Sequence, residues 1–283
     1  MVVLFRLLAR WPLPLLHALG WCVGWGMWVA SRSYRQRWAR HTALAGLSGL
    51  ERRLSIGEAG KQITELPRLW FGPPVKVGWQ GAAHIEAALQ HRQGVLLLTP
   101  HMGCFEVAAQ AYAERFGHQG ADAKPITVLF RPPRDPQLLP LLEAARQRPG
   151  LLTAPTTLRG VRQLALALKA GQAVGLLPDQ VPPEGLGVWA PFFGQPAYTM
   201  TLSARLAQVS GIQVLLVWGE RLPWGRGYVV HVQTWQEVMG GPMDLRVEEA
   251  AAQVNQAMER IVSQKPEQYL WAYARYKQPR KAG

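Results

Sequence analysis

Apolar and polar positions follow two rhythms along the chain. Short apolar or alternating runs, typical of buried strands, occur at 75–79, 94–99, 125–130, 173–177, 212–218 and 228–235. Segments with apolar residues three and four positions apart predict helices at 83–90, 105–116, 158–171 and 247–262. Because strands and helices alternate, we predict a three-layer α/β sandwich around a mostly parallel, mixed sheet.

Two helical regions are defined less sharply. Residues 41–70 are helical in composition but poorly patterned, whereas the helix predicted at 158–171 ends at a glycine, as helices often do. Asp244 lies just before the last helix and is expected to cap it. No internal repeat or long low-complexity run is visible, so a single domain accounts for residues 41–283.

The N-terminal segment 11–30, WPLPLLHALGWCVGWGMWVA, contains no Asp, Glu, Lys or Arg. It is about as long as a helix that crosses a bilayer, roughly 20 residues. Four arginines follow it closely: Arg32, Arg35, Arg37 and Arg40. This charge bias predicts that everything after residue 31 is cytoplasmic. We therefore expect an inner-membrane protein in which residues 1–40 form the anchor and its basic flank.

Two other interpretations of this segment remain open. A cleaved signal peptide would have a shorter apolar region and a small-residue cleavage site, which only residues 29–31 resemble, and the arginines that follow oppose export. A helix that lies in the membrane interface is the stronger alternative, because Pro12, Pro14 and the glycines weaken an ideal span.

The chain as a whole is basic. Its 31 Lys+Arg against 18 Asp+Glu give a formal net charge of +13. Such a charge indicates an anionic partner, for example acidic headgroups, a phosphorylated substrate or an acidic carrier protein. We expect no nucleic acid partner, because the sequence has no zinc-finger spacing, RNP-like aromatic strand or Gly-Lys-Ser/Thr loop. The two cysteines, Cys22 and Cys104, are expected to be reduced thiols.

Ionisable residues follow three successive predicted strands at their carboxyl ends. His101 and Glu106 follow the first in LLLTPHMGCFE, Arg131 follows the second and Asp179 the third. Because ligands of open α/β sheets bind beyond the carboxyl ends of the strands, these residues predict a single site.

His101 and Glu106 also suggest a pair by themselves. Pro100 and Gly103 disfavour one continuous helix, so we expect His101 on a loop and Glu106 in the first turn of the next helix. A folded-back loop would let the carboxylate hold one ring nitrogen and leave the other as a general base. From the spacing alone, a capping glutamate beside a surface histidine is the better interpretation.

Five sequence blocks change that balance. HMGCFE (101–106), FRPPRDPQLLPLLEAARQR (130–148), LLPDQ (176–180), APFFGQPAYTMT (190–201) and EQYLWAYARYK (267–277) stand in this order. They resemble the blocks of the lipid A biosynthesis acyltransferases, the late acyltransferases of lipopolysaccharide assembly within the lysophospholipid acyltransferase superfamily. The resemblance runs from the N-terminal apolar segment nearly to the end of the chain. It implies a fold like that of glycerol-3-phosphate acyltransferase and an acyltransferase domain at 41–283.

The resemblance also implies roles for particular residues. His101 matches the catalytic base and Glu106 its acidic partner, while Arg131, Arg146 and Asp179 match positions used for substrate binding or catalytic support. The implied reaction moves a fatty acyl group from a thioester, with acyl carrier protein as the expected donor, to a hydroxyl of a phosphorylated glycolipid, the lipid A precursor. It needs no metal and no cofactor. Arg146, or backbone amides of the Pro-Phe-Phe-Gly block, are candidate donors to the oxyanion.

Two departures from the family blocks are present. LLEAARQR differs from the usual Arg-Gly-Arg, which makes Arg146 the least secure match, with Arg148 close by. Cys104-Phe105 stands where Asn-Trp is common, and this puts the acceptor or acyl-chain preference in doubt. Asp179 is expected to act in catalysis or to hold an arginine or its loop in place.

Three alternatives remain. Another acyltransferase of the superfamily would acylate a glycerophospholipid or other lysolipid, and a non-catalytic membrane protein would bind lipid without turnover. Cys104 could also form an acyl-enzyme, because thiolates attack thioesters well. For the C-terminal aromatics Tyr269, Trp271, Tyr273 and Tyr276, core packing is a better interpretation than an acyl channel or a membrane contact.

Overall fold

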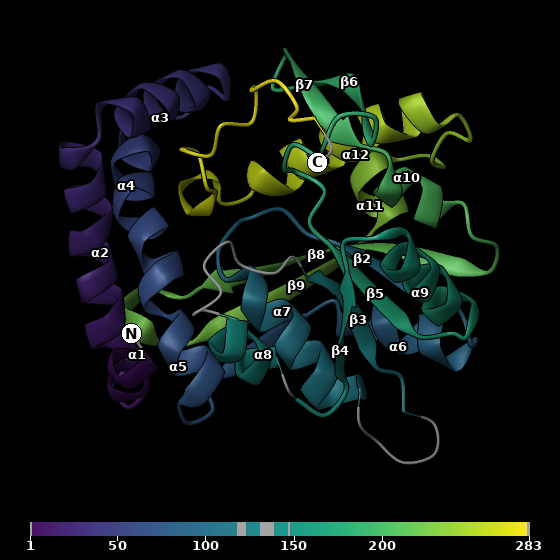
Figure 1. The fold of residues 1–283 in the computed structure, drawn as a ribbon, viewed down its shortest axis with the longest axis horizontal. Coiled ribbons are helices and arrows are strands. Elements are labelled where there is room, and N and C mark those ends of the chain that lie inside the picture. Colours follow the sequence, from purple (N-terminus) through teal and green to yellow (C-terminus); the bar gives the residue numbers. More distant parts are fainter. Residues whose placement is uncertain (1, 118–122, 131–138, 147, 282–283) are drawn as a thin grey trace.

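The computed structural model describes residues 2–117, 123–130, 139–146 and 148–281, and for residues 2, 3, 139–141 and 146 it describes the backbone alone. At its centre lies a seven-stranded sheet with the order β1-β9-β8-β2-β5-β3-β4 (Figure 1). The strands are β1 Val77–Gln80, β2 Gly94–Leu98, β3 Ile126–Phe130, β4 Leu151–Pro155, β5 Ala173–Leu176, β8 Ile212–Arg221 and β9 Tyr228–Thr234.

The direction of the strands divides the sheet into two parts. From β8 through β2, β5 and β3 to β4 all neighbours are parallel, whereas β9 is antiparallel to β8 and β1 is parallel to β9. The mostly parallel, mixed sheet expected from the sequence is confirmed.

Helices cover both faces of this sheet. α6 (Ala82–Gln90) and α7 (Phe105–Tyr112) share one core with Val95 and Leu97, and the π-helical turn η1 (Ala113–Gly117) continues α7. α9 (Leu158–Lys169), α10 (Leu202–Ala207) and α12 (Val247–Val262) share the other core with Leu96 and Leu98. Consecutive residues of β2 thus point into opposite cores, which explains its uninterrupted apolar run.

Several shorter elements complete the fold around the sheet. They are α8 (Leu139–Arg146), α11 (Trp235–Met239), the 3-10 turns η4 (Pro223–Gly225) and η5 (Pro266–Gln268), and an antiparallel hairpin of β6 (Gly187–Phe192) and β7 (Gln195–Met200). The sequence pattern predicts neither β4 nor this hairpin. The cap expected at Asp244 is wrong: Arg246 is the N-cap residue of α12, and Asp244 accepts the Arg246 amide instead.

Five helices precede the sheet and stand together at the left of Figure 1. They are α1 (Val2–Leu8), α2 (Leu13–Ala30), α3 (Arg32–Leu44), α4 (Gly49–Thr64) and α5 (Leu66–Phe71). By length and composition α2 could cross a membrane, and 28% of it is buried within the protein. It lies along α4, and glycines let the two backbones meet: a Cβ on Gly60 would come 2.0 Å from the Gly20 oxygen.

Candidate active site

The register of the sheet places His101 and Asp179 side by side. β2 and β5 are parallel neighbours in which Leu98 pairs with Leu176. His101 and Asp179 each stand three residues beyond that pair. Two parallel strands of equal reach therefore deliver a histidine and a carboxylate to the same point at the carboxyl edge of the sheet.

Asp179 holds His101 through two hydrogen bonds. Nδ1 of the ring lies 2.6 Å from Oδ1, and the backbone N–H of His101 donates to Oδ2 at 2.9 Å. The carboxylate is 2% exposed and the imidazole 18%. Since the carboxylate accepts at Nδ1, the proton of a neutral ring resides there and the lone pair is left on Nε2.

Buried neighbours keep this carboxylate ionised. Burial raises the pKa of Asp179, but the charge and hydrogen bonds of His101, together with Arg275, outweigh burial and hold the pKa below its ordinary value. Arg275 is 2% exposed, and its guanidinium donates to the Tyr198 carbonyl, to Thr199 Oγ1 and to Asn255 Oδ1. Asp179 thus resembles the orienting carboxylate of a base rather than a proton donor.

The second ring nitrogen of His101 is also contacted. The Gln180 amide nitrogen lies 3.0 Å from Nε2. A hydroxyl that gave its proton to Nε2 would have to take the place of this amide.

Backbone hydrogen bonds and a required glycine hold the loop that carries His101. Gly103 adopts a φ of 54°, and a Cβ there would come 2.0 Å from the Gly219 oxygen, so only glycine fits. Its carbonyl accepts from the Arg221 guanidinium and its amide donates to the Gln268 carbonyl, both at 2.9 Å. The Leu270 amide donates to the His101 carbonyl at 3.1 Å. The C-terminal block 267–277 therefore holds the loop in place.

Arg221 is the centre of a buried ionic network beneath the loop. Its guanidinium binds both oxygens of Glu65, at 2.8 and 2.7 Å, and Glu58 at 2.7 Å. Burial raises the pKa of Glu65, but Arg221 outweighs burial and lowers this pKa to about 2. The network joins the junction of α4 and α5 to the end of β8 and to the catalytic loop.

Glu106 lies in the first turn of α7, as expected. Within the described chain both ring nitrogens of His101 are held by other residues, Asp179 and Gln180. The charge of Glu106 acts on Arg148. Burial lowers the pKa of Arg148 below its ordinary value, and the charges of Glu114 and Glu106 partly offset this effect. Asp179 thus holds the ring nitrogen that the sequence assigned to Glu106, because the end of β5 lies level with the loop after β2.

Two predicted arginines cannot be placed by their side chains. Arg131 lies outside the described residues, and Arg146 ends α8 with its side chain outside them. Arg148 is described: it donates to the carbonyl oxygens of Leu69 and Trp70.

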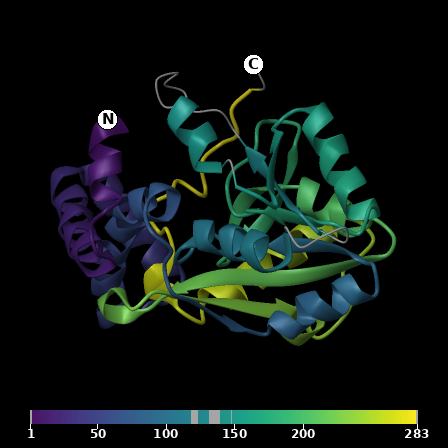
Figure 2. The same ribbon diagram turned by 90° about the horizontal axis from the view of Figure 1, so that it is seen from below.

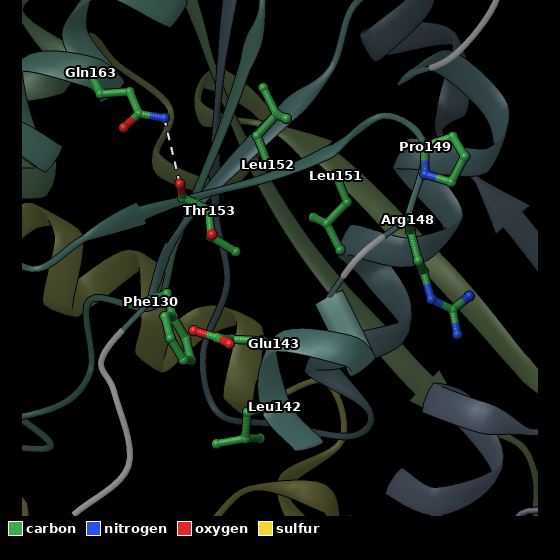
Figure 3. A pocket seen from close by; sticks show the side chains of 9 residues that line it. All are labelled: Phe130, Leu142, Glu143, Arg148, Pro149, Leu151, Leu152, Thr153 and Gln163. Atoms are coloured by element: carbon green, nitrogen blue, oxygen red, sulfur yellow. Dashed lines mark hydrogen bonds between the residues drawn. The ribbon is translucent and has the colours of Figure 1, made fainter. Parts of the chain in front are cut away.

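A hollow of about 550 Å³ opens at the β3–β4 edge of the sheet (Figure 3). Phe130 at the end of β3 and Leu142 of α8 line it, together with Glu143, whose carboxylate points toward Phe130. Val128 of β3 pairs with Gly175 of β5, so the register brings Phe130 level with residue 177, two before Asp179. The hollow therefore begins about one strand away from the His101–Asp179 pair.

The Pro-Phe-Phe-Gly block is not available as an oxyanion donor at Phe193. The Phe193 amide, in the turn between β6 and β7, donates to Glu259 of α12 at 2.6 Å. Phe192 is 2% exposed and lies 6.4 Å from the Tyr269 ring centre to centre. Tyr269 and Trp271 are buried too, so core packing is confirmed for these two of the C-terminal aromatics.

Cys104 lies deep beneath the site. It is 2% exposed, and burial followed by the charge of Glu65 raises the pKa of its thiol well above the ordinary value. A neutral, buried thiol is a poor nucleophile.

His101, oriented by Asp179, lies at the strand ends of an α/β sandwich, and this arrangement suits a general base. The family model described as bacterial lipid A biosynthesis acyltransferase matches residues 53–278, and the chain belongs to this family.

Curated relatives agree with the family match. The chain is 26% identical to the lipid A biosynthesis lauroyltransferase of Escherichia coli (strain K12) over 96% of this chain and 88% of that protein. It is 28% identical to the lipid A biosynthesis palmitoleoyltransferase of the same organism, over 81% of this chain and 74% of that protein. A lipid A biosynthesis acyltransferase of Shigella flexneri matches to the same degree.

The sequence did not predict two residues that act on the His101–Asp179 pair. Gln180 was visible only as the residue after Asp179, and Arg275 only as part of a C-terminal block. The sequence shows that His101 and Asp179 each follow a strand. It does not show that the two strands are neighbours, and this strand order is what brings the two residues together.

Proposed function

We propose that this acyltransferase moves a fatty acyl group from acyl carrier protein to a hydroxyl of a lipid A precursor at the cytoplasmic face of the inner membrane. The observation that carries the proposal is the His101–Asp179 pair, in which Asp179 holds Nδ1 at 2.6 Å and Nε2 contacts the neutral amide of Gln180. The net charge of +13 suits both an acidic carrier protein and a phosphorylated glycolipid.

His101 acts as the general base in the proposed step. Nε2 takes the proton of the acceptor hydroxyl while its oxygen attacks the thioester carbonyl carbon. The tetrahedral intermediate then expels the donor thiolate by breaking the carbon–sulfur bond, and the imidazolium returns the proton to that sulfur. Asp179 stabilises the imidazolium between the two transfers. A positioned base of this kind contributes roughly 10²–10⁴-fold.

Glu106 and the arginines have supporting roles in the proposal. Glu106 acts from the first turn of α7, where its charge reaches Arg148. Arg131 and Arg146 bind the phosphates of the acceptor, because guanidinium groups suit phosphate geometry. The hollow at the β3–β4 edge receives sugar hydroxyls of the acceptor, since side chains such as Glu143 and Thr153, which can hydrogen-bond hydroxyl groups, line it beside Phe130.

The test is transfer of a labelled acyl group by the purified protein to a phosphorylated diglucosamine lipid. We expect turnover with acyl carrier protein as donor, a fall of about 10²-fold or more in His101→Ala, and no fall in the control His91→Ala, which changes an exposed histidine. Equal turnover with His101→Ala would refute the catalytic role of His101. Faster transfer to a lysophospholipid than to the glucosamine lipid would favour the glycerophospholipid alternative.

Placement at the inner membrane is tested separately. A reporter fused after Gly283 should be active on the cytoplasmic side. Activity of that reporter only in the periplasm would overturn the proposed orientation.

A further inference from the structure

We infer that α2 lies flat on an anionic lipid surface and does not cross the bilayer, and that Trp224 from the β8–β9 hairpin enters the same surface. The inference deepens the membrane location proposed above and rests on it. It says which face of the protein meets the lipid and how the chain is oriented there.

The first observation is that α2 is joined to α4 along its length. A Cβ on Gly24 would come 2.1 Å from the Ile56 oxygen, and one on Gly20 would come 2.4 Å from Thr64 Oγ1. Thr64 donates to the Leu16 carbonyl at 2.7 Å. Figure 1 shows α2 as the outermost helix, with α4 between it and the rest of the protein. Wherever α2 lies in a membrane, α4 has to lie beside it.

The second observation is that α4 cannot enter hydrocarbon. It carries five charged residues: Glu51, Arg52, Arg53, Glu58 and Lys61. Glu58 binds the buried Arg221 of the sheet, and Gln62 donates to the Gln268 carbonyl, so α4 is fixed to the catalytic domain. Charged side chains at the bilayer centre are strongly unfavourable. If α2 crossed the membrane, either the charged residues of α4 would enter the bilayer or the glycine contacts between α2 and α4 would break.

The third observation is the outward face of α2. The side away from α4 is an exposed, uncharged stripe at helical spacing, which we call the apolar stripe: Leu15, Leu19, Cys22, Gly26 and Val29. Leu15 is 54% exposed and Val29 65%. The exposed arginines Arg6 and Arg10 precede the stripe, and Arg32 follows it. Arginines at both ends of this apolar face suit the headgroups of an anionic lipid surface.

A second segment of the chain extends this surface. At the tip of the hairpin, Trp224 is 86% exposed and adopts a left-handed φ of 60°. The following Gly225 touches α2, since a Cβ there would come 2.4 Å from the Pro14 nitrogen. In Figure 2 the hairpin reaches the N-terminal helices. Holding a bulky side chain in this strained conformation, exposed to water, costs stability, and such strain clusters at functional positions. An exposed tryptophan next to the start of α2 suits the headgroup region.

The experiment measures the depth of three points on the apolar stripe in vesicles. A fluorescent label is placed on the exposed Cys22, and, in a Cys22→Ala background, on Leu15→Cys or Val29→Cys. Cys104 is buried, so the Cys22→Ala variant, treated with the same reagent, should take up no label and serves as the control. Quenchers fixed at different depths of phosphatidylglycerol-containing vesicles report the position of each label.

A flat helix and a crossing helix give opposite patterns. Positions 15 and 29 are about 21 Å apart along the helix axis, at 1.5 Å per residue. If α2 lies flat, all three labels have the same shallow depth of about 5–10 Å. Depths that differ along the helix, with position 22 deepest, overturn the inference in favour of a span. Labels that no lipid quencher reaches also overturn it, and a second copy of the chain on this face would then show as a dimer.

Three further measurements sharpen the result. A reporter placed before residue 1 should be cytoplasmic, like one placed at the C-terminus, whereas a span puts it in the periplasm. Changing Arg6, Arg10 and Arg32 to Gln should weaken vesicle binding by roughly 10²-fold, from about fivefold for each arginine near the surface. Trp224→Ala should weaken binding while Leu245→Ala, an equally exposed residue before α12, does not. If both variants bind vesicles equally well, Trp224 is not part of the surface that contacts lipid.

These outcomes are independent of catalysis. Acyl transfer to a detergent-dispersed acceptor tests the proposed function, and it needs no bilayer. A protein that transfers acyl groups but shows graded label depths would keep the function and lose the flat orientation.

Discussion

Replacing Asp179 by Asn tests which carboxylate orients His101, the proposed general base. The carboxylate accepts two hydrogen bonds from His101, at Nδ1 and at the backbone N–H. An amide has no charge and only one acceptor oxygen, so it can keep only one of these hydrogen bonds. Its NH₂ group then faces the other donor. The ring becomes positively charged only in the transition state, so the variant loses there a buried ion pair, and breaking such a pair costs about 3–5 kcal/mol. At 1.36 kcal/mol for each factor of ten, kcat should fall about 10²–10⁴-fold.

Glu106→Gln is the matched comparison, because it also exchanges a carboxylate for an amide. Since Asp179 and Gln180 hold the ring nitrogens, we expect Glu106→Gln to lower kcat by about tenfold or less. The assay is steady-state acyl transfer from acyl carrier protein to a diglucosamine lipid, with thermal unfolding of each variant as the control for folding.

A further variant separates orientation from other effects of Asp179. The double variant with His101→Ala should be little worse than His101→Ala alone, because an orienting carboxylate cannot assist an absent base. Wild-type kcat in Asp179→Asn together with a loss of 10³-fold or more in Glu106→Gln would refute the assignment of Asp179 as the partner and restore Glu106.

Other consequences of the structure can be checked in the same preparation. Gln180→Glu should lower kcat by about 10²-fold, because a carboxylate at Nε2 favours the imidazolium and removes the base, whereas Gln180→Ala should cost tenfold or less. Cys104→Ala should keep most of its acyl transfer, and a stable acyl-cysteine intermediate together with an inactive variant would contradict this. Glu65→Gln should lower the free energy of unfolding by about 3–5 kcal/mol, because it leaves Arg221 buried without its main partner, while Glu86→Gln at an exposed pair should cost less than about 1 kcal/mol. The pKa of Glu65 lies below its ordinary value, so its contribution to the free energy of unfolding is present above about pH 4.5 and is lost as the pH falls toward 2. Denaturation measured between pH 6 and pH 2 should show this loss in the wild type and not in Glu65→Gln.

The sequence predicted the central sheet because its strands are buried on both faces. A strand such as β2 must be apolar throughout, and this pattern is visible without the structure. β4 is an edge strand whose Leu152 and Thr153 are exposed, so its apolar signal is weak. The β6–β7 hairpin packs on α12 and lies outside the main sheet, and its proline-rich sequence reads as a turn.

The candidate site was predicted in part for a related reason. Strand ends identified His101 and Asp179 separately, but a linear sequence does not give strand order, and the nearer Glu106 therefore appeared to be the natural partner. That β5 is inserted beside β2 depends on crossovers through helices, which local patterns do not encode. The buried network of Glu65 and Arg221 unites residues more than 150 positions apart, as only the folded chain can show.

The equal reach of the two strand ends has a consequence for how this protein can change over time. Most loops of α/β proteins accept insertions, because their length affects little beyond the surface. Here the turn after β2 and the turn after β5 must keep the same length, since each carries its functional side chain three residues beyond a paired leucine. One residue added to either turn would move a carboxylate or an imidazole by about 3.3 Å and separate the pair. Variation in substrate preference is therefore confined to the helices and outer loops around this edge, while the two short turns stay fixed in length.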